Sequence, residues 1–163
     1  MTVTLRGHLR SRSVARVVYG AIVGLALVVA LEDHPATAAA TAAIVLGTAV
    51  AVALAELYSE LLGLRVRLGP GVDRGHRVAI VENMTAVAIG AGFPAVFFLL
   101  AATGAIELGT AFSLAKWSGL GLISSYGFAA ARLGGTDLKG SVLQGLAVGA
   151  IGALVIAIKA LVH

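Results

Sequence analysis

The chain has 163 residues, of which 59% are hydrophobic and 12% charged, about half the charged share of a typical soluble domain. This composition indicates an integral membrane protein, and the absence of cysteine excludes disulfides, thiolate metal sites and thiol catalysis. The formal net charge of +4 comes mostly from Lys and Arg between the apolar segments, where membrane orientation explains them without a nucleic-acid partner.

Five apolar segments are long enough, or nearly so, to cross a bilayer as helices, since a crossing needs about 20 apolar residues. The connections between them are short. We therefore expect an all-α, polytopic membrane protein with five transmembrane helices in a single transmembrane domain, residues 1–163. The predicted spans cover about 14–31, 36–64, 78–103, 106–131 and 138–162.

The first segment follows a basic stretch and has a short apolar core, residues 17–31. Arg16 can extend its side chain to the membrane surface, which lengthens the span by two residues. The same pattern, with small residues at 36–38, also resembles a cleaved signal peptide. We expect an uncleaved first helix, because residues 32–35 form a tight connection to the second span and Pro35 suits the first turn of that helix.

The basic residues predict the orientation. The connections at 32–35 and 104–105 contain no Lys or Arg. All three basic regions fall on the other side of a five-span chain, so the positive-inside rule places the N-terminus in the cytoplasm and the C-terminus outside the cell membrane. These regions contain Arg6, Arg10, Arg12 and Arg16, then Arg65, Arg67, Arg74 and Arg77, and finally Arg132 and Lys139.

Three glutamates lie in or beside the second and third spans. Glu56 and Glu60 are four residues apart, so they share one helix face near its cytoplasmic end. Glu82 lies near the start of the next span, at a similar depth. Like charges at this spacing repel unless a cation or a shared proton lies between them, and ionisable residues inside a membrane are candidate functional sites. Alternatively, the carboxylates are solvated, or they pair with Arg65, Arg67 or Arg77.

Met84 is the only methionine after the first residue and lies two positions after Glu82. A thioether beside carboxylates suits a transition-metal path, although most methionines only fill a core. The predicted metal ligands are therefore Glu56, Glu60, Glu82 and Met84, for a divalent ion such as Fe²⁺ or Mn²⁺. We expect no other cofactor. Further along the same span, Pro94 predicts a kink.

Lys116 lies near the middle of the fourth span, where a lysine costs about 2.5 to 3.5 kcal/mol on insertion scales. We expect it to face a wet cavity or an acidic partner, with Glu82 and Glu56 as the candidates. Glycine stripes in the first and last spans predict close packing of helices or subunits. They consist of Gly20 and Gly24, and of Gly145, Gly149 and Gly152.

Two stretches resemble the vacuolar iron transporter family. Residues 55–63 read Ala-Glu-Leu-Tyr-Ser-Glu-Leu-Leu-Gly, similar to that family's acidic second helix, and residues 127–159 are similar to its last two helices. The resemblance implies a dimeric exporter of ferrous and related divalent ions that is coupled to protons. The family's Asp-Gly pair in helix 1 is missing from residues 19–24, and the short stretch 65–77 replaces its cytoplasmic metal-binding insertion.

The sequence contains no phosphate-binding loop, dinucleotide fingerprint, HExxH motif or paired nucleophile and base, so we do not expect an enzyme. We expect a homodimeric membrane protein that transports or binds a divalent cation through a carboxylate cluster on the cytoplasmic side. The alternative is a non-transporting scaffold or partner subunit, in which the acids pair with Lys116 and with arginines at the membrane surface.

Overall fold

The computed structural model describes the backbone of residues 2–68 and 74–162, and the side chains of residues 14–66, 75–158 and 161. The described chain is helical and contains no strand, so the all-α fold class is confirmed. Five arginines used in the orientation argument lie outside the described side chains: Arg6, Arg10, Arg12, Arg67 and Arg74. The helices are α1 (Thr2–Leu31), α2 (Ala38–Leu68), α3 (Arg74–Gly92), α4 (Ala95–Ala102), α5 (Leu108–Leu133) and α6 (Leu138–Val162).

Several of these helices are long and apolar enough to cross a membrane. Within the described residues they are Val14–Leu31 in α1, Ala38–Val66 in α2 and Leu138–Ile158 in α6, with a fourth if the bent pair α3 and α4 forms one span. Helix α5, which corresponds to the fourth predicted span, is not among them by this measure. Large apolar side chains are exposed along α2 and α6, as expected for helices in lipid: Val50, Leu54, Tyr58, Leu143, Leu146 and Leu154.

Short polar side chains determine where α2 and α6 begin. The Thr37 hydroxyl accepts a hydrogen bond from the Ala40 amide at 3.3 Å, and the Asp137 carboxylate accepts one from the Gly140 amide at 3.1 Å. Both are N-cap interactions, in which a side-chain oxygen satisfies an amide of the first helical turn. The placement of Pro35 in the first turn of the second helix is therefore wrong, because the helix begins at Ala38, after the Thr37 cap.

The predicted kink in the third span is confirmed. The axes of Gly75–Gly92 and Ala95–Ala102 differ in direction by 48°. The break contains Pro94, whose ring nitrogen cannot donate to a carbonyl one turn earlier and whose ring displaces that carbonyl. Pro94 is fully buried, and α4 consequently turns towards α5. There the Phe98 and Phe112 rings meet edge to face, with centroids 4.8 Å apart.

Glycines allow the backbones of α1 and α3 to touch. A methyl group on Gly20 would overlap the carbonyl oxygen of Val87, and one on Gly24 would lie 2.6 Å from the carbonyl oxygen of Ala91. From the other side, a methyl group on Gly90 would overlap the carbonyl oxygen of Val17. The predicted stripe of Gly20 and Gly24 therefore packs two helices of the same chain.

Helices α5 and α6 form a second close pair. A methyl group on Gly145 would lie 2.9 Å from the Ser124 carbonyl oxygen, and one on Gly149 would overlap the Ser124 hydroxyl. On α5, a methyl group on Gly127 would lie 2.9 Å from Cβ of Val148. The glycine stripe of the last span thus packs α6 against α5 within one chain.

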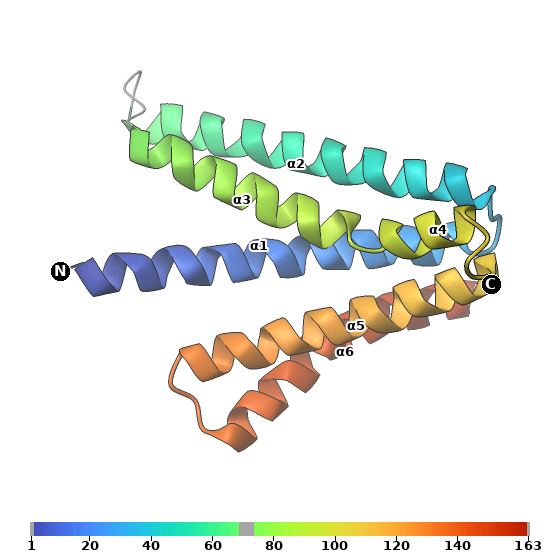
Figure 1. Cartoon of the computed structure of the whole chain (residues 1–163). Helices are drawn as coiled ribbons and strands as arrows, with labels where there is room; N and C mark the ends of the chain where they lie inside the picture. Colours follow the sequence, from blue (N-terminus) through green and yellow to red (C-terminus); the bar gives the residue numbers. More distant parts are fainter. Residues whose placement is uncertain (1, 69–73, 163) are drawn as a thin grey trace.

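Helix α1 lies between the α2–α3 pair and the α5–α6 hairpin (Figure 1). Helices α1, α2, α4, α5 and α6 come together at the end of the bundle that contains the α1–α2 connection, which we call the converging end. They spread apart towards the end that contains the α5–α6 connection, the diverging end. The start of α1 lies at the diverging end and the end of α6 at the converging end. The main core cluster joins four helices near the converging end, through Val28, Ala42, Val45, Ala95, Phe98, Ala111, Phe112 and Ala115.

Candidate functional site

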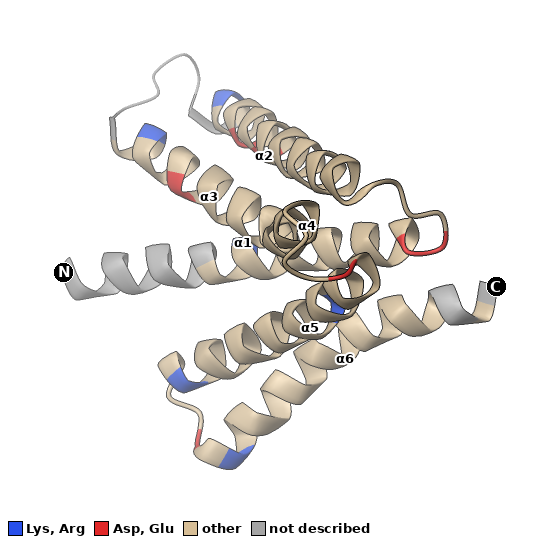
Figure 2. Cartoon of the chain, turned by 45° about the vertical axis from the view of Figure 1, so that its right-hand side comes forward, with Lys and Arg blue, Asp and Glu red and all other residues tan. Residues whose placement is uncertain are grey.

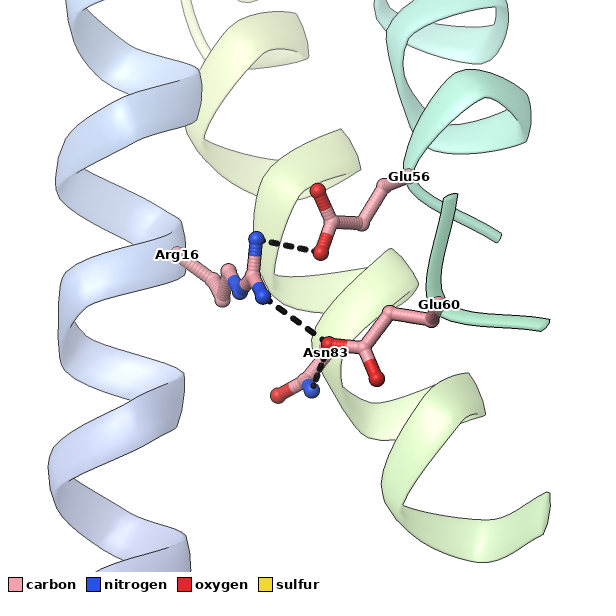
Figure 3. A network of polar contacts seen from close by, with 4 residues as sticks. All are labelled: Arg16, Glu56, Glu60 and Asn83. Atoms are coloured by element: carbon pink, nitrogen blue, oxygen red, sulfur yellow. Dashed lines mark hydrogen bonds and ion pairs between the residues drawn. The ribbon is translucent and has the colours of Figure 1, made fainter. Parts of the chain in front are cut away.

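Arg16 on α1 points at two carboxylates on α2 (Figure 3). Its Nη1 atom forms an ion pair with Oε1 of Glu56, and its Nη2 atom lies 2.9 Å from Oε1 of Glu60. The planar guanidinium presents two nitrogens side by side, and glutamates four residues apart on a helix offer two carboxylates at a matching spacing. The single arginine therefore bridges both acids.

A third helix completes this group. The Asn83 side chain on α3 donates a hydrogen bond from Nδ2 to Oε1 of Glu60 at 3.0 Å. Asn83 is only 5% exposed, so its amide must find partners inside the bundle. The same oxygen of Glu60 consequently receives contacts from both α1 and α3. We call Arg16, Glu56, Glu60 and Asn83 the inner polar cluster.

The inner polar cluster has unequal numbers of positive and negative groups. Glu56 and Glu60 each carry −1 when ionised, whereas Arg16 carries +1 and Asn83 none, which leaves a formal charge of −1 on these described side chains. The side chains of Glu56 and Glu60 are only 10% and 21% exposed, against 36% for Arg16. Oε1 of Glu56 is buried and makes no hydrogen bond of good geometry, so its described compensation is the ion pair with Arg16. An excess negative charge at a desolvated position favours a proton or a further cation.

The two other predicted ligands, Glu82 and Met84, flank Asn83 along α3. Glu82 is exposed and Met84 is partly buried. Consecutive helical residues point about 100° apart, so Asn83 faces the cluster while Glu82 faces away from it. Among the described residues, no three His, Cys, Asp or Glu side chains lie close enough together to hold a metal ion. The structure thus brings Glu56 and Glu60 together without Glu82, and the metal-ligand assignment stays a prediction.

The described partner of Glu56 and Glu60 is Arg16, which is not among the three arginines considered from the sequence. Arg65 and Arg77 are exposed, and the side chain of Arg67 lies outside the described residues. A depth count would have found Arg16. Arg16 lies 15 residues before the end of α1 (31 − 16), and Glu56 lies 18 residues after the start of α2 (56 − 38). At the rise of a helix, these counts place them about 23 Å and 27 Å from the α1–α2 connection, and so at similar depths.

A second ion pair lies near the converging end. Nζ of Lys116 on α5 is 2.6 Å from Oε1 and 2.8 Å from Oε2 of Glu32, in the α1–α2 connection. Both side chains are partly buried. The expected pairing of Lys116 with Glu82 or Glu56 is therefore wrong. Lys116 lies eight residues into α5 (116 − 108), about 12 Å from its start, so it lies in the half of the helix nearer the converging end.

Comparison with known proteins identified no relative. No family model, no curated protein and no solved structure matches the chain.

Proposed function

We propose that this chain is a five-span membrane protein that binds and transports a divalent cation through Glu56 and Glu60. The observation that carries the proposal is the sharing of one guanidinium by two largely buried carboxylates, which leaves a formal charge of −1 on the described side chains. A purely structural ion pair needs one carboxylate. A second acid in a lipid-exposed helix adds a desolvation cost and a negative charge that the guanidinium does not neutralise, unless a proton or cation does so.

The proposed cycle exchanges Arg16 for the cation. With Arg16 in place, its guanidinium occupies the position between the two carboxylates that an ion would take. Carboxylate oxygens are hard ligands that suit Mn²⁺ or Fe²⁺, and protons are the proposed counter-ion. Asn83 holds Glu60 in either state, because its amide donates to Glu60 independently of Arg16. The flux experiment described below also tests whether Glu82 takes part.

Three features support the proposed topology, including α5 as a span. The start of α1 and the end of α6 lie at opposite ends of the bundle, as an odd number of crossings requires (Figure 1). Helix α5 runs beside α6 and against α1, both of which are long and apolar enough to span. Apart from Arg16 and Lys116, the described basic residues lie at helix ends of the diverging end (Figure 2): Arg65, Arg77, Arg132 and Lys139. The positive-inside rule makes this the cytoplasmic end.

The test is metal flux into proteoliposomes that contain a metal-sensitive dye. We expect the wild type to admit Mn²⁺ or Fe²⁺, and Glu56→Gln and Glu60→Gln to abolish the flux. Glu107→Gln is the matched control, because Glu107 is exposed at the other end of the bundle and makes no side-chain capping hydrogen bond. Loss of flux in Glu82→Gln would add Glu82 to the site. An inactive wild type, or active Glu56 and Glu60 variants, would refute the transport proposal.

A second candidate is a scaffold or partner subunit without transport. The Lys116–Glu32 ion pair favours it, because this pair shows that the chain also uses charges to join helices. In that case, Glu56→Gln and Glu60→Gln would lower thermal stability, and neither they nor the wild type would carry metal. Flux and unfolding measured on the same preparations therefore separate the two candidates.

A further inference from the structure

We infer that the Lys116–Glu32 ion pair is a latch, which holds the α5–α6 hairpin against the rest of the bundle at the converging end. When the latch opens, the hairpin tilts as one body and the spacing of helices at the diverging end changes. This inference concerns the movement of helices and does not depend on cation binding by Glu56 and Glu60.

The hairpin has the internal contacts of a rigid body. The α5 and α6 backbones approach closely at Gly145. A methyl group added there would lie 2.9 Å from the Ser124 carbonyl oxygen. Gly127 and Gly149 provide two more close contacts, with the side chains of Val148 and Ser124. Because these contacts involve both helices and two successive turns of α6, the two helices cannot easily slide or separate.

Helices α1 and α3 form the second rigid body. Gly20 and Gly90 each face a backbone carbonyl on the partner helix so closely that a methyl group would overlap it. Arg16 joins α2 to this body through its ion pairs with Glu56 and Glu60. The bundle is thus divided into a hairpin and a body of α1, α2 and α3 that contains the inner polar cluster. The short helix α4 packs with α1, α2 and α5 in the main core cluster.

The described side-chain contacts between the two bodies lie mostly towards the converging end. Leu25 on α1 lies against Gly119 of α5 and Gly152 of α6. A methyl group added at Gly119 would lie 3.6 Å from one δ carbon of Leu25, and one added at Gly152 would lie 3.2 Å from the other. A second core cluster joins Ala21, Leu25 and Val29 of α1 to Ile123 of α5. Among the described residues, no buried α5 residue after Ile123 belongs to this cluster or to the main one. Beyond this point the hairpin diverges from α1 (Figure 1). The described interface is therefore a joint that covers the part of the hairpin nearer the converging end.

The Lys116–Glu32 pair lies at this joint and connects the two bodies directly. The ammonium contacts both oxygens of the Glu32 carboxylate, at 2.6 and 2.8 Å. The apolar contacts around it include the Phe98 and Phe112 rings, which meet edge to face. The short ammonium–carboxylate contacts restrict separation of the two bodies at this joint, because a charge-assisted hydrogen bond weakens as its atoms move apart. Loss of the pair removes this restriction but leaves the apolar joint.

Distance measurements in nanodiscs test the latch. The chain contains no cysteine, so spin labels can be attached to cysteines introduced at Val78 and Leu133, two exposed positions at the diverging end of α3 and α5. We expect Lys116→Met to broaden or shift the label-to-label distance distribution beyond the wild-type spread. The charge-reversed pair Glu32→Lys with Lys116→Glu should bring the distribution back towards wild type. Glu107→Gln, at the same end of the bundle, should leave it unchanged.

Two results would overturn the latch. One is a Lys116→Met distribution that superimposes on that of the wild type. The other is a change that the charge-reversed pair does not reduce. If Lys116→Met does not elute as a folded, monodisperse protein, Glu32→Gln opens the same ion pair from the other side, and the same comparison is made with that variant. Metal flux is not a readout here, so a failed latch and a failed transport proposal are distinguishable.

Discussion

Arg16 and Glu60 are 44 residues apart in the chain, and their side chains meet between α1 and α2 with 2.9 Å from Nη2 to Oε1. The guanidinium also pairs with Glu56. This one side chain therefore links α1 to two successive turns of α2, and it determines whether the two carboxylates repel each other.

Replacement of Arg16 by glutamine should destabilise the protein. It removes the only described positive charge from the inner polar cluster and leaves two carboxylates facing each other. Breaking a fully buried ion pair costs about 3 to 5 kcal/mol, and partial exposure reduces this to roughly 1 to 2 kcal/mol. Thermal unfolding in detergent should show a lower midpoint. The double variant Arg16→Gln with Glu56→Gln should recover part of the loss, and an unchanged midpoint in the single variant would contradict the structure.

The same arginine should compete with metal ions. If Mn²⁺ binds between Glu56 and Glu60, Arg16→Gln should increase its affinity, because the guanidinium no longer occupies the position. A unit charge about 4 Å away contributes about 4 kcal/mol at an effective dielectric constant of 20, so an affinity gain of tenfold or more is expected after solvent screening. The measurement is Mn²⁺ binding by calorimetry, with Glu56→Gln as the variant that should not bind. Weaker binding by Arg16→Gln would argue against a shared position.

Metal ions should also protect the folded protein. A ligand at a hundred times its dissociation constant stabilises the native state by about 2.7 kcal/mol. Mn²⁺ should therefore raise the unfolding midpoint of the wild type and leave that of Glu56→Gln unchanged. An equal concentration of NaCl controls for ionic strength. Equal protection of both proteins would show that the ion acts elsewhere.

Asn83 should be sensitive to the charge of its replacement. Asn83→Leu removes one hydrogen bond to Glu60, a loss of about 1 kcal/mol. Asn83→Asp has nearly the same shape but places a third carboxylate beside Glu60, so we expect a greater loss of stability than for leucine. Chemical or thermal unfolding of the two variants under identical conditions makes the comparison. Equal stability of the two variants would mean that Asn83 does not contact a charged Glu60.

The glycines between α1 and α3 should tolerate no methyl group. Gly20→Ala and Gly90→Ala place Cβ on top of a backbone carbonyl oxygen, which a rotamer change cannot relieve. Overpacking of this kind costs about 1 to 3 kcal/mol. Gly47→Ala on α2 is the matched control, because its methyl group would meet open space and alanine favours helix by about 1 kcal/mol. Stability measured in lipid should fall for the first two and should not fall for the control.

The sequence by itself determined the local features. Hydrophobic composition predicted helices in a membrane, Pro94 predicted the break between α3 and α4, and the glycine spacing predicted close helix contacts. The spacing of Glu56 and Glu60 also placed them on one face of a helix. Each of these conclusions depends on the geometry of a single helix, which repeats every 3.6 residues wherever the helix packs.

Only the tertiary structure decided which charges meet. It paired Glu56 and Glu60 with Arg16, paired Lys116 with Glu32, and left Glu82 outside the inner polar cluster. These pairings depend on the relative rotation and axial position of different helices. Glycine contacts at Gly20 and Gly90 fix how closely α1 and α3 approach, and the Pro94 bend fixes where α4 turns. A sequence pattern within one helix does not contain this information.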